Sequence, residues 1–342
     1  MKSKILSAAK ILFFLGLGIA LIFLFVNKLS EEDKDKIINA VLNADYSWIL
    51  ASMIFGTLAH ISRAMRWKQL LEPLDYKPKL SNTFFAVMIM YFANLAVPRL
   101  GEVSRCAILK RYEGIPVEKS FGTVVAERAI DLIFLALIFL LTLIFQWDLF
   151  METLEVVKNL GTNTPGENQE KSIVLPLLAI IAAIAGGVLF LFRKNARIKL
   201  IYGKILNLIL GFVSGLKSAI KVKNPLLFIG HSIFIWLMYI LMVYICFFSL
   251  PATAELPFHV CMMLLIFGSL GIIIVPGGIG IYPAIISAVL GLYAIDEPTG
   301  YAFGWIVWIG QTVLLIVWGL ISFTLLPIVN KRSKNVASSA AQ

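Results

Sequence analysis

Apolar residues occur along this chain in long unbroken blocks, rather than at the spacing of an amphipathic helix or strand. Such blocks are typical of helices that cross a lipid bilayer, because a hydrocarbon core of about 30 Å requires about 20 consecutive apolar residues. Lipid offers no partners to the backbone, so each crossing segment must pair its own amides. The pattern therefore predicts an all-α, polytopic transmembrane helical bundle, with a single integral membrane domain over residues 1–330.

Six of the blocks are long enough to cross the bilayer: residues 5–26, 46–66, 121–145, 173–192, 226–250 and 301–329. Two other apolar stretches are broken by proline and glycine, and we expect them to form re-entrant hairpins over residues 84–111 and 258–294. Both breaks begin with Val-Pro, at Val97-Pro98 and Val275-Pro276. This correspondence indicates an inverted repeat of the kind found in transporters. A bundle of eight or more plain crossings is the alternative.

Charged residues at the ends of the blocks predict the orientation. Basic residues follow the second and the last block, and acidic residues dominate the stretch after the first. Both termini are therefore expected in the cytoplasm, with the protein in the inner (cytoplasmic) cell membrane. The first block lacks a small-residue cleavage site and is interpreted as a retained anchor. Residues 193–223 carry basic residues and no acidic ones, which predicts an amphipathic cytoplasmic connector. Residues 331–342 are expected to be a short, basic, disordered tail.

The composition agrees with a membrane protein and argues against two other classes. Hydrophobic residues make up 59% of the chain and charged residues 15%, with a net charge of +10. The basic residues flank apolar blocks and no nucleic-acid motif accompanies them, so we expect no nucleic-acid partner. Cys106, Cys246 and Cys261 lack the spacing of a disulfide framework or a zinc site. No metal or other cofactor is expected.

Ionisable residues near membrane segments form three clusters, and such residues persist in membranes where they pair or act. Arg63 and Arg66 lie at i, i+3 on neighbouring positions of one helix face. They are interpreted either as ligands of a lipid phosphate or as anchors that reach the membrane surface. The second cluster surrounds the first Val-Pro break and consists of Asn94, Pro98, Arg99, Gly101, Glu102 and Arg105. Its arginines are candidate phosphate ligands, Glu102 is a candidate partner for them, and an ordinary polar loop is the alternative.

The third cluster is Glu127, Arg128 and Asp131, which fall within one helical turn. Buried charges must be matched internally, so Glu127 or Asp131 is expected to pair with an arginine of the other clusters. These partners are Arg63, Arg99 or Arg105. A purely structural lock between helices is the other interpretation. The second break, at Pro276, Gly277, Gly278 and Gly280, carries no charge and would contribute backbone dipoles or a tight packing turn.

No catalytic motif accompanies these clusters. The chain has no nucleophile elbow and no phosphate-binding glycine loop with a lysine, and its three histidines are scattered. The residues themselves therefore indicate no catalytic site, and an enzymatic role is not supported by any sequence signal.

Taken in order, the motifs resemble the lysylphosphatidylglycerol synthase transmembrane-region family, often described as flippase-like integral membrane proteins. They are Arg63-x-x-Arg66-Trp67, Asn94-x-x-x-Pro98-Arg99-x-Gly101-Glu102-x-x-Arg105, Glu127-Arg128-x-x-Asp131 and Pro276-Gly277-Gly278-Ile279-Gly280. The resemblance covers about residues 5–330 and implies a module that moves a polar-headed lipid between leaflets. Fused members add a cytosolic aminoacyl-transferase, which we expect to be absent here. The chain departs from the family at Ile281-Tyr282-Pro283, where many members carry an acidic residue.

Three functions are compatible with this reading. The first is a flippase-like translocase for an anionic or phosphate-containing phospholipid or lipid-linked substrate. The second is a membrane subunit or partner of a separate aminoacyl or glycosyl transferase that acts on a lipid-linked substrate. The third is a lipid-binding scaffold without turnover.

Overall fold

The computed structural model of this chain describes residues 23, 29–97, 100–147, 222–275 and 277–339. The predicted crossings at 5–26 and 173–192 and the connector at 193–223 therefore lie outside the described residues, apart from isolated positions. The chain divides into two compact units, residues 1–139 with 215–342, and residues 140–214. Everything below concerns the first unit, except for the last turns of one helix.

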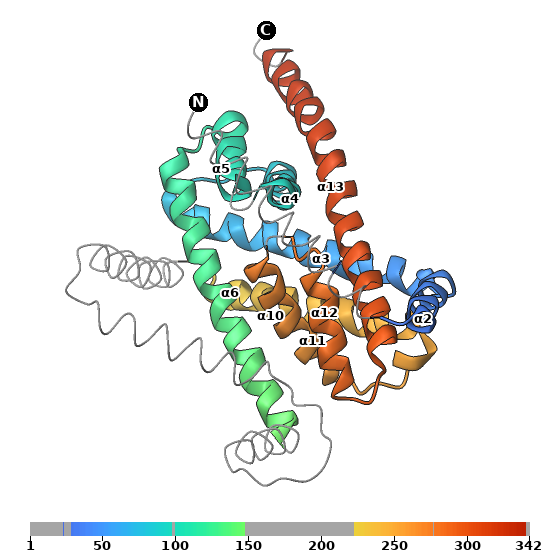
Figure 1. Cartoon of the computed structure of the whole chain (residues 1–342). Helices are drawn as coiled ribbons and strands as arrows, with labels where there is room; N and C mark the ends of the chain where they lie inside the picture. The colour runs from blue at the N-terminus through green and yellow to red at the C-terminus, as the bar shows by residue number, and fades with distance from the viewer. Residues whose placement is uncertain (1–22, 24–28, 98–99, 148–221, 276, 340–342) are drawn as a thin grey trace, which may run out of the picture. The chain divides into compact units, whose positions relative to one another are not determined.

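The described residues form a series of α-helices, and residues 148–221 lie outside the described part of the chain (Figure 1). The helices are α2 (Glu31–Leu42), α3 (Tyr46–Leu71), α4 (Leu80–Ala96), α5 (Leu100–Glu113), α6 (Val117–Phe145), α10 (Pro225–Cys246), α11 (Val260–Ile274), α12 (Ile281–Gly291) and α13 (Glu297–Ser339). Short 3-10 turns follow α3 and α10, at Glu72–Leu74, Phe247–Ser249 and Pro251–Thr253. The all-helical prediction is confirmed.

Four of these helices are long and apolar enough to cross a bilayer, namely α3, α6, α10 and α13, each counted with any adjoining 3-10 turn. They coincide with the segments predicted to cross at 46–66, 121–145, 226–250 and 301–329, except that the third ends at Ser249. The last one differs at its end, because α13 continues to Ser339 through most of the segment expected to be a disordered tail. That segment has no glycine or proline to stop a helix, and it contains alanine and lysine, which favour one.

Each predicted hairpin is a pair of packed helices separated by a break. Helix α4 packs against α5, and α11 against α12. The first break follows Val97, which has an extended backbone, and α5 begins at Leu100. The side chain of Asn94 then bridges the break, because its Oδ1 accepts a hydrogen bond of 2.8 Å from the amide of Gly101. Gly101 also allows close packing, since a Cβ there would lie 2.1 Å from the carbonyl oxygen of Met90.

The second break is shaped by glycines in left-handed conformations. Gly277, Gly278 and Gly280 have φ angles of 82°, 71° and 75°, which only glycine adopts without strain. The indole Nε1 of Trp308, on α13, donates a hydrogen bond of 2.7 Å to the carbonyl of Gly277. The amides of Gly278 and Tyr282 also donate to the carbonyls of Val275 and Gly278, so the turn between α11 and α12 is held by backbone conformation and hydrogen bonds, without charged residues.

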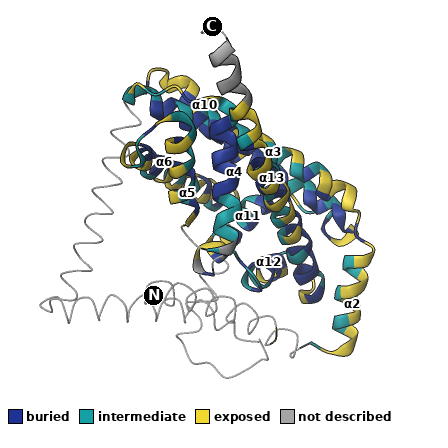
Figure 2. Ribbon diagram, turned by 90° about the horizontal axis from the view of Figure 1, so that it is seen from above, coloured by how far each residue is buried: buried dark blue, intermediate teal, exposed yellow. Residues whose placement is uncertain are grey.

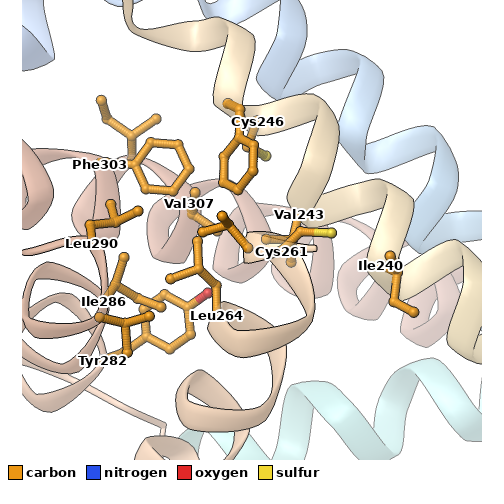
Figure 3. Packing of buried hydrophobic residues seen from close by; sticks show 14 of the residues in the cluster. Ile240, Val243, Cys246, Cys261, Leu264, Tyr282, Ile286, Leu290, Phe303 and Val307 are labelled. Atoms are coloured by element: carbon orange, nitrogen blue, oxygen red, sulfur yellow. The ribbon is translucent and has the colours of Figure 1, made fainter. Parts of the chain in front are cut away.

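Buried apolar side chains form two clusters. In the first, residues of α10 meet those of α11, α12 and α13, and Figure 3 shows Phe303, Leu264, Ile286 and Val243 packed together there. The second joins α4, α5 and the C-terminal half of α3 to α6. By contrast, α2 has no buried residue and its surface is largely exposed or half-buried in Figure 2. A Ser30–Asp33 capping box begins that helix.

Candidate functional site

Glu127 lies at the centre of a buried cluster of charged side chains. Its Oε1 accepts a hydrogen bond of 2.7 Å from Nη1 of Arg63, and its Oε2 accepts one of 2.9 Å from Nη1 of Arg105. All three residues are buried. One carboxylate on α6 is therefore bonded to arginines from α3 and α5, two helices that are separate in the sequence.

Asp131, one turn further along α6, completes the attachment to α3. Its Oδ2 accepts a hydrogen bond of 2.6 Å from Nη1 of Arg63, and its Oδ1 accepts one of 2.6 Å from Nη2 of Arg66. Arg66 is fully buried and also donates a hydrogen bond of 3.1 Å to the hydroxyl of Ser232, on α10. The expected pairing of the α6 carboxylates with Arg63 and Arg105 is present, and Arg66 takes part as well.

Arg105 is positioned from two sides. Besides its bond to Glu127, its guanidinium lies 4.4 Å from the ring centroid of Trp67, a cation–π contact. The indole of Trp67 is in turn fixed by a hydrogen bond of 2.8 Å to the hydroxyl of Thr123, on α6. Trp67 directly follows Arg66 on α3, so the same helix turn orients arginines from two helices.

Glu102 contacts an arginine that the sequence did not suggest as its partner. Of the two expected partners, Arg99 lies outside the described residues and Arg105 bonds Glu127 instead, while Nη2 of Arg128 donates a hydrogen bond of 2.8 Å to Oε1 of Glu102. Because Arg105 turns toward Glu127, Glu102 at the start of α5 is left facing α6. The side chain of Arg128 is 44% exposed, so this ion pair forms the accessible edge of the cluster.

The other predicted residues divide into two groups. Asn94 and Gly101 hold the first break together, as described above, and Gly277, Gly278 and Gly280 form the second. Pro98, Arg99 and Pro276 lie outside the described residues.

Several donors in the cluster have no protein partner in the described part of the chain. They are Nε of Arg63, Nε of Arg66, and Nε and Nη2 of Arg105. Buried guanidinium groups are stabilised only when most of their N–H groups are paired, and an unpaired polar group costs about 1–3 kcal/mol. Among the described members, four arginines face three carboxylates, so the cluster keeps a net positive charge. It is suited to hold a negatively charged group.

A cavity of about 450 Å³ opens beside this cluster. Its polar end is formed by Arg63, Arg128 and Asp131, together with His60 and Tyr91. The rest of the wall is mostly apolar, with residues of α6, α10, α11 and α13, including Leu132, Leu135, Met242, Val243, Leu265, Ile272, Ile273 and Leu314. Arg66 and Arg105 do not line it. The cavity thus combines a charged end with a hydrocarbon-like wall, and its size is within the range of ligand pockets, about 300–1,000 Å³.

Sequence reasoning missed the neutral polar residues of this cavity: Tyr91, Trp236, Tyr239, Ser269 and Gln311. Each is an isolated polar or amphipathic residue within an apolar helix. Single positions of this kind are common in membrane helices, and only Trp236 and Tyr239, at i, i+3 on α10, have a spacing that would group them. His60 gave a stronger signal, because it shares a helix face with Arg63 at i, i+3.

Metal binding has no support in the described residues, where no group of three or more histidine, cysteine or acidic side chains is close enough to hold an ion. Cys106, Cys246 and Cys261 are buried as free thiols.

Comparisons with known proteins give two related sequences. Over 100 residues the chain is 32% identical to a UPF0104 membrane protein of Methanocaldococcus jannaschii, which covers 28% of this chain and 30% of that protein. Over 121 residues it is 26% identical to the glycosyltransferase AglD of Haloferax volcanii, covering 35% of this chain and 18% of AglD. The chain therefore aligns with less than a third of either relative's length.

No solved structure matches the chain. The family model described as the lysylphosphatidylglycerol synthase TM region matches residues 8–329. This match extends over nearly the whole sequence and includes the buried charge cluster and both helix breaks. The chain is therefore a multi-pass membrane protein that belongs to the lysylphosphatidylglycerol synthase TM-region family.

Proposed function

We propose that this protein binds the headgroup of an anionic, phosphate-containing lipid in the cavity beside the charge cluster and moves that lipid between membrane leaflets. One observation carries the proposal: a cavity with Arg63 and Arg128 at one end and an apolar wall elsewhere, among helices of membrane-crossing length. A phosphate would be held by the guanidinium groups, and acyl or prenyl chains would contact the apolar wall.

The arginines have separate roles in this proposal. Arg66 and Arg105 are buried and bonded to carboxylates, so they hold the cluster together. Arg63 joins the cluster to the cavity, since it bonds both carboxylates of α6 and also lines the wall. Arg128 is the most accessible of the four arginines, and it pairs with Glu102 at the edge of the cluster. Replacing Glu102 by a lipid phosphate costs little, because an exposed ion pair contributes only about 0–1 kcal/mol.

The test is leaflet exchange in proteoliposomes that contain fluorescent phosphatidylglycerol or phosphatidylcholine. We expect exchange of the anionic lipid to exceed that of the zwitterionic lipid, and Arg128→Gln to slow the anionic lipid by about tenfold, because a charge-assisted hydrogen bond contributes about 1.5–3 kcal/mol. Arg111→Gln is the matched control, since Arg111 is also exposed but does not line the cavity. Equal rates for protein-containing and protein-free liposomes, with every anionic lipid tried, would contradict translocation.

A second function is favoured by one comparison. A relative is named a glycosyltransferase, which supports a role for this chain as the membrane subunit or partner of a lipid-linked transferase. In that case the same cavity would present a lipid phosphate to an enzyme. Deletion would abolish the transferase product without changing lipid exchange, and a transferase would co-purify with the full chain. Loss of exchange in the deletion strain, with product formation intact, would favour translocation instead.

A further inference from the structure

The charged end of the cavity is flanked by a continuous group of aromatic side chains. The ring of His60, on α3, lies 4.7 Å from that of Tyr91, on α4, and 6.2 Å from that of Tyr239, on α10. The ring of Tyr239 is in turn 6.0 Å from that of Trp236, with an interplanar angle of 89°, whereas the angle between Tyr239 and His60 is 68°. All four line the cavity. Four rings from three helices therefore line the same cavity as Arg63.

Two of these rings carry buried nitrogen atoms that have no partner among the described residues. They are Nε1 of Trp236 and Nδ1 of His60. Trp236 is 9% exposed and His60 is 5% exposed. An indole N–H can only donate, and an imidazole nitrogen can donate or accept. A sugar hydroxyl, which both donates and accepts, can bond either group.

A simple phosphate headgroup would leave these groups unused. Phosphate oxygens would be attracted to Arg63 and Arg128, and lipid chains offer no hydrogen bonds. A sugar ring matches the remaining features, because its hydroxyls lie around the rim while its C–H groups make an apolar face that packs on an aromatic ring. Tyrosine and tryptophan combine such a face with a polar atom at the edge.

We propose that the lipid taken by this cavity carries a sugar attached through its phosphate. The phosphate lies against Arg63 and Arg128, and the sugar packs against the aromatic group with hydroxyls bonded to Trp236 and His60. This inference rests on the proposed lipid-binding function and narrows the class of lipid. A phosphatidylglycerol headgroup, which also has hydroxyls but no ring, is the nearest competing ligand.

The direct test measures binding to the purified full-length chain in detergent, by isothermal titration or native mass spectrometry. The probes are a short-chain prenyl phosphohexose, the same prenyl monophosphate without the sugar, and a short-chain phosphatidylglycerol. We expect the phosphohexose to bind at least tenfold more tightly than either of the others. Affinities within about twofold for all three would overturn the sugar assignment and leave anionic lipid binding in place, whereas no binding of any probe would contradict the proposed function itself.

A substitution of Trp236 tests whether the sugar is bound at the aromatic group. Trp236→Phe keeps an aromatic ring and removes the N–H, so we expect it to weaken the phosphohexose about fivefold and to leave the prenyl monophosphate unchanged. Trp48→Phe is the matched control, because Trp48 is exposed at the N-terminal end of α3 and does not line the cavity. Equal weakening of both ligands by Trp236→Phe would place the sugar elsewhere. If this variant fails to fold, the comparison of the three probes on the unaltered chain still decides the question.

Discussion

The breaks within the two helix pairs begin with the same Val-Pro sequence, but they are held in different ways. The α4–α5 break is bridged by Asn94, and α5 is tied to α6 through Arg105 and Glu127. The α11–α12 break has no charged residue and depends on left-handed glycines and the Trp308 hydrogen bond. Ion pairs connect the first pair to other helices, whereas the second is determined mainly by its own backbone.

This difference indicates separate roles for the two pairs. In the first pair, α5 contributes Arg105 to the charge cluster and α4 contributes Tyr91 to the polar end of the cavity. In the second pair, α11 contributes mainly apolar residues to the cavity wall. A change in the first break should therefore disturb charge pairing across several helices. A change in the second should mostly disturb its own turn.

The largest effect is expected from Glu127→Ala, which removes the carboxylate shared by Arg63, Arg66 and Arg105. Leaving buried cations without their counter-charge destabilises a protein by about 3–5 kcal/mol. Unfolding in detergent, followed by circular dichroism during SDS titration, measures the loss. Glu118→Ala, at the exposed start of the same helix, is the control and should change stability by less than about 0.5 kcal/mol. Similar values for the two variants would show that the cluster is not a stabilising junction.

An intermediate effect is expected from Gly101→Ala, at the first break. The added Cβ would lie 2.1 Å from the backbone oxygen of Met90, which can yield only if α4 and α5 separate. Overpacking of this kind costs about 1–3 kcal/mol. Gly122→Ala on α6 is the matched control, because nothing lies within 4 Å of its Cβ position. It should leave stability unchanged or raise it slightly, and an equal loss in both variants would argue against tight α4–α5 packing.

The smallest effects are expected at the second break. Gly277 and Gly278 both have left-handed φ, which costs another residue about 1–2 kcal/mol. A Cβ at Gly277 meets nothing within 4 Å, whereas one at Gly278 lies 3.0 Å from the side chain of Ile272. Gly278→Ala should therefore be the more destabilising in thermal unfolding, and Gly277→Asn should lose less than Gly277→Ala because asparagine tolerates this conformation. Identical losses would indicate that the turn relaxes freely.

The sequence determined the helical class, four described helices long enough to cross a bilayer and the two breaks, because block length and the positions of proline and glycine are local properties. It also indicated that Glu127 and Asp131 require arginine partners, since charges in a membrane must be matched. Partner identity could not follow from spacing, and Glu102 shows this, because its contact with Arg128 depends on which way Arg105 turns.

The tertiary structure alone decided which charged residues face a cavity. Arg63, Arg66, Arg105 and Arg128 are the same residue type beside similar apolar segments, yet only Arg63 and Arg128 line the wall. Whether a guanidinium group faces the cavity depends on how the surrounding helices pack. That packing cannot be predicted from the position of a single residue in the sequence. The aromatic group beside Arg63 arises in the same way, from rings on three helices that are distant in sequence and meet only when the bundle has formed.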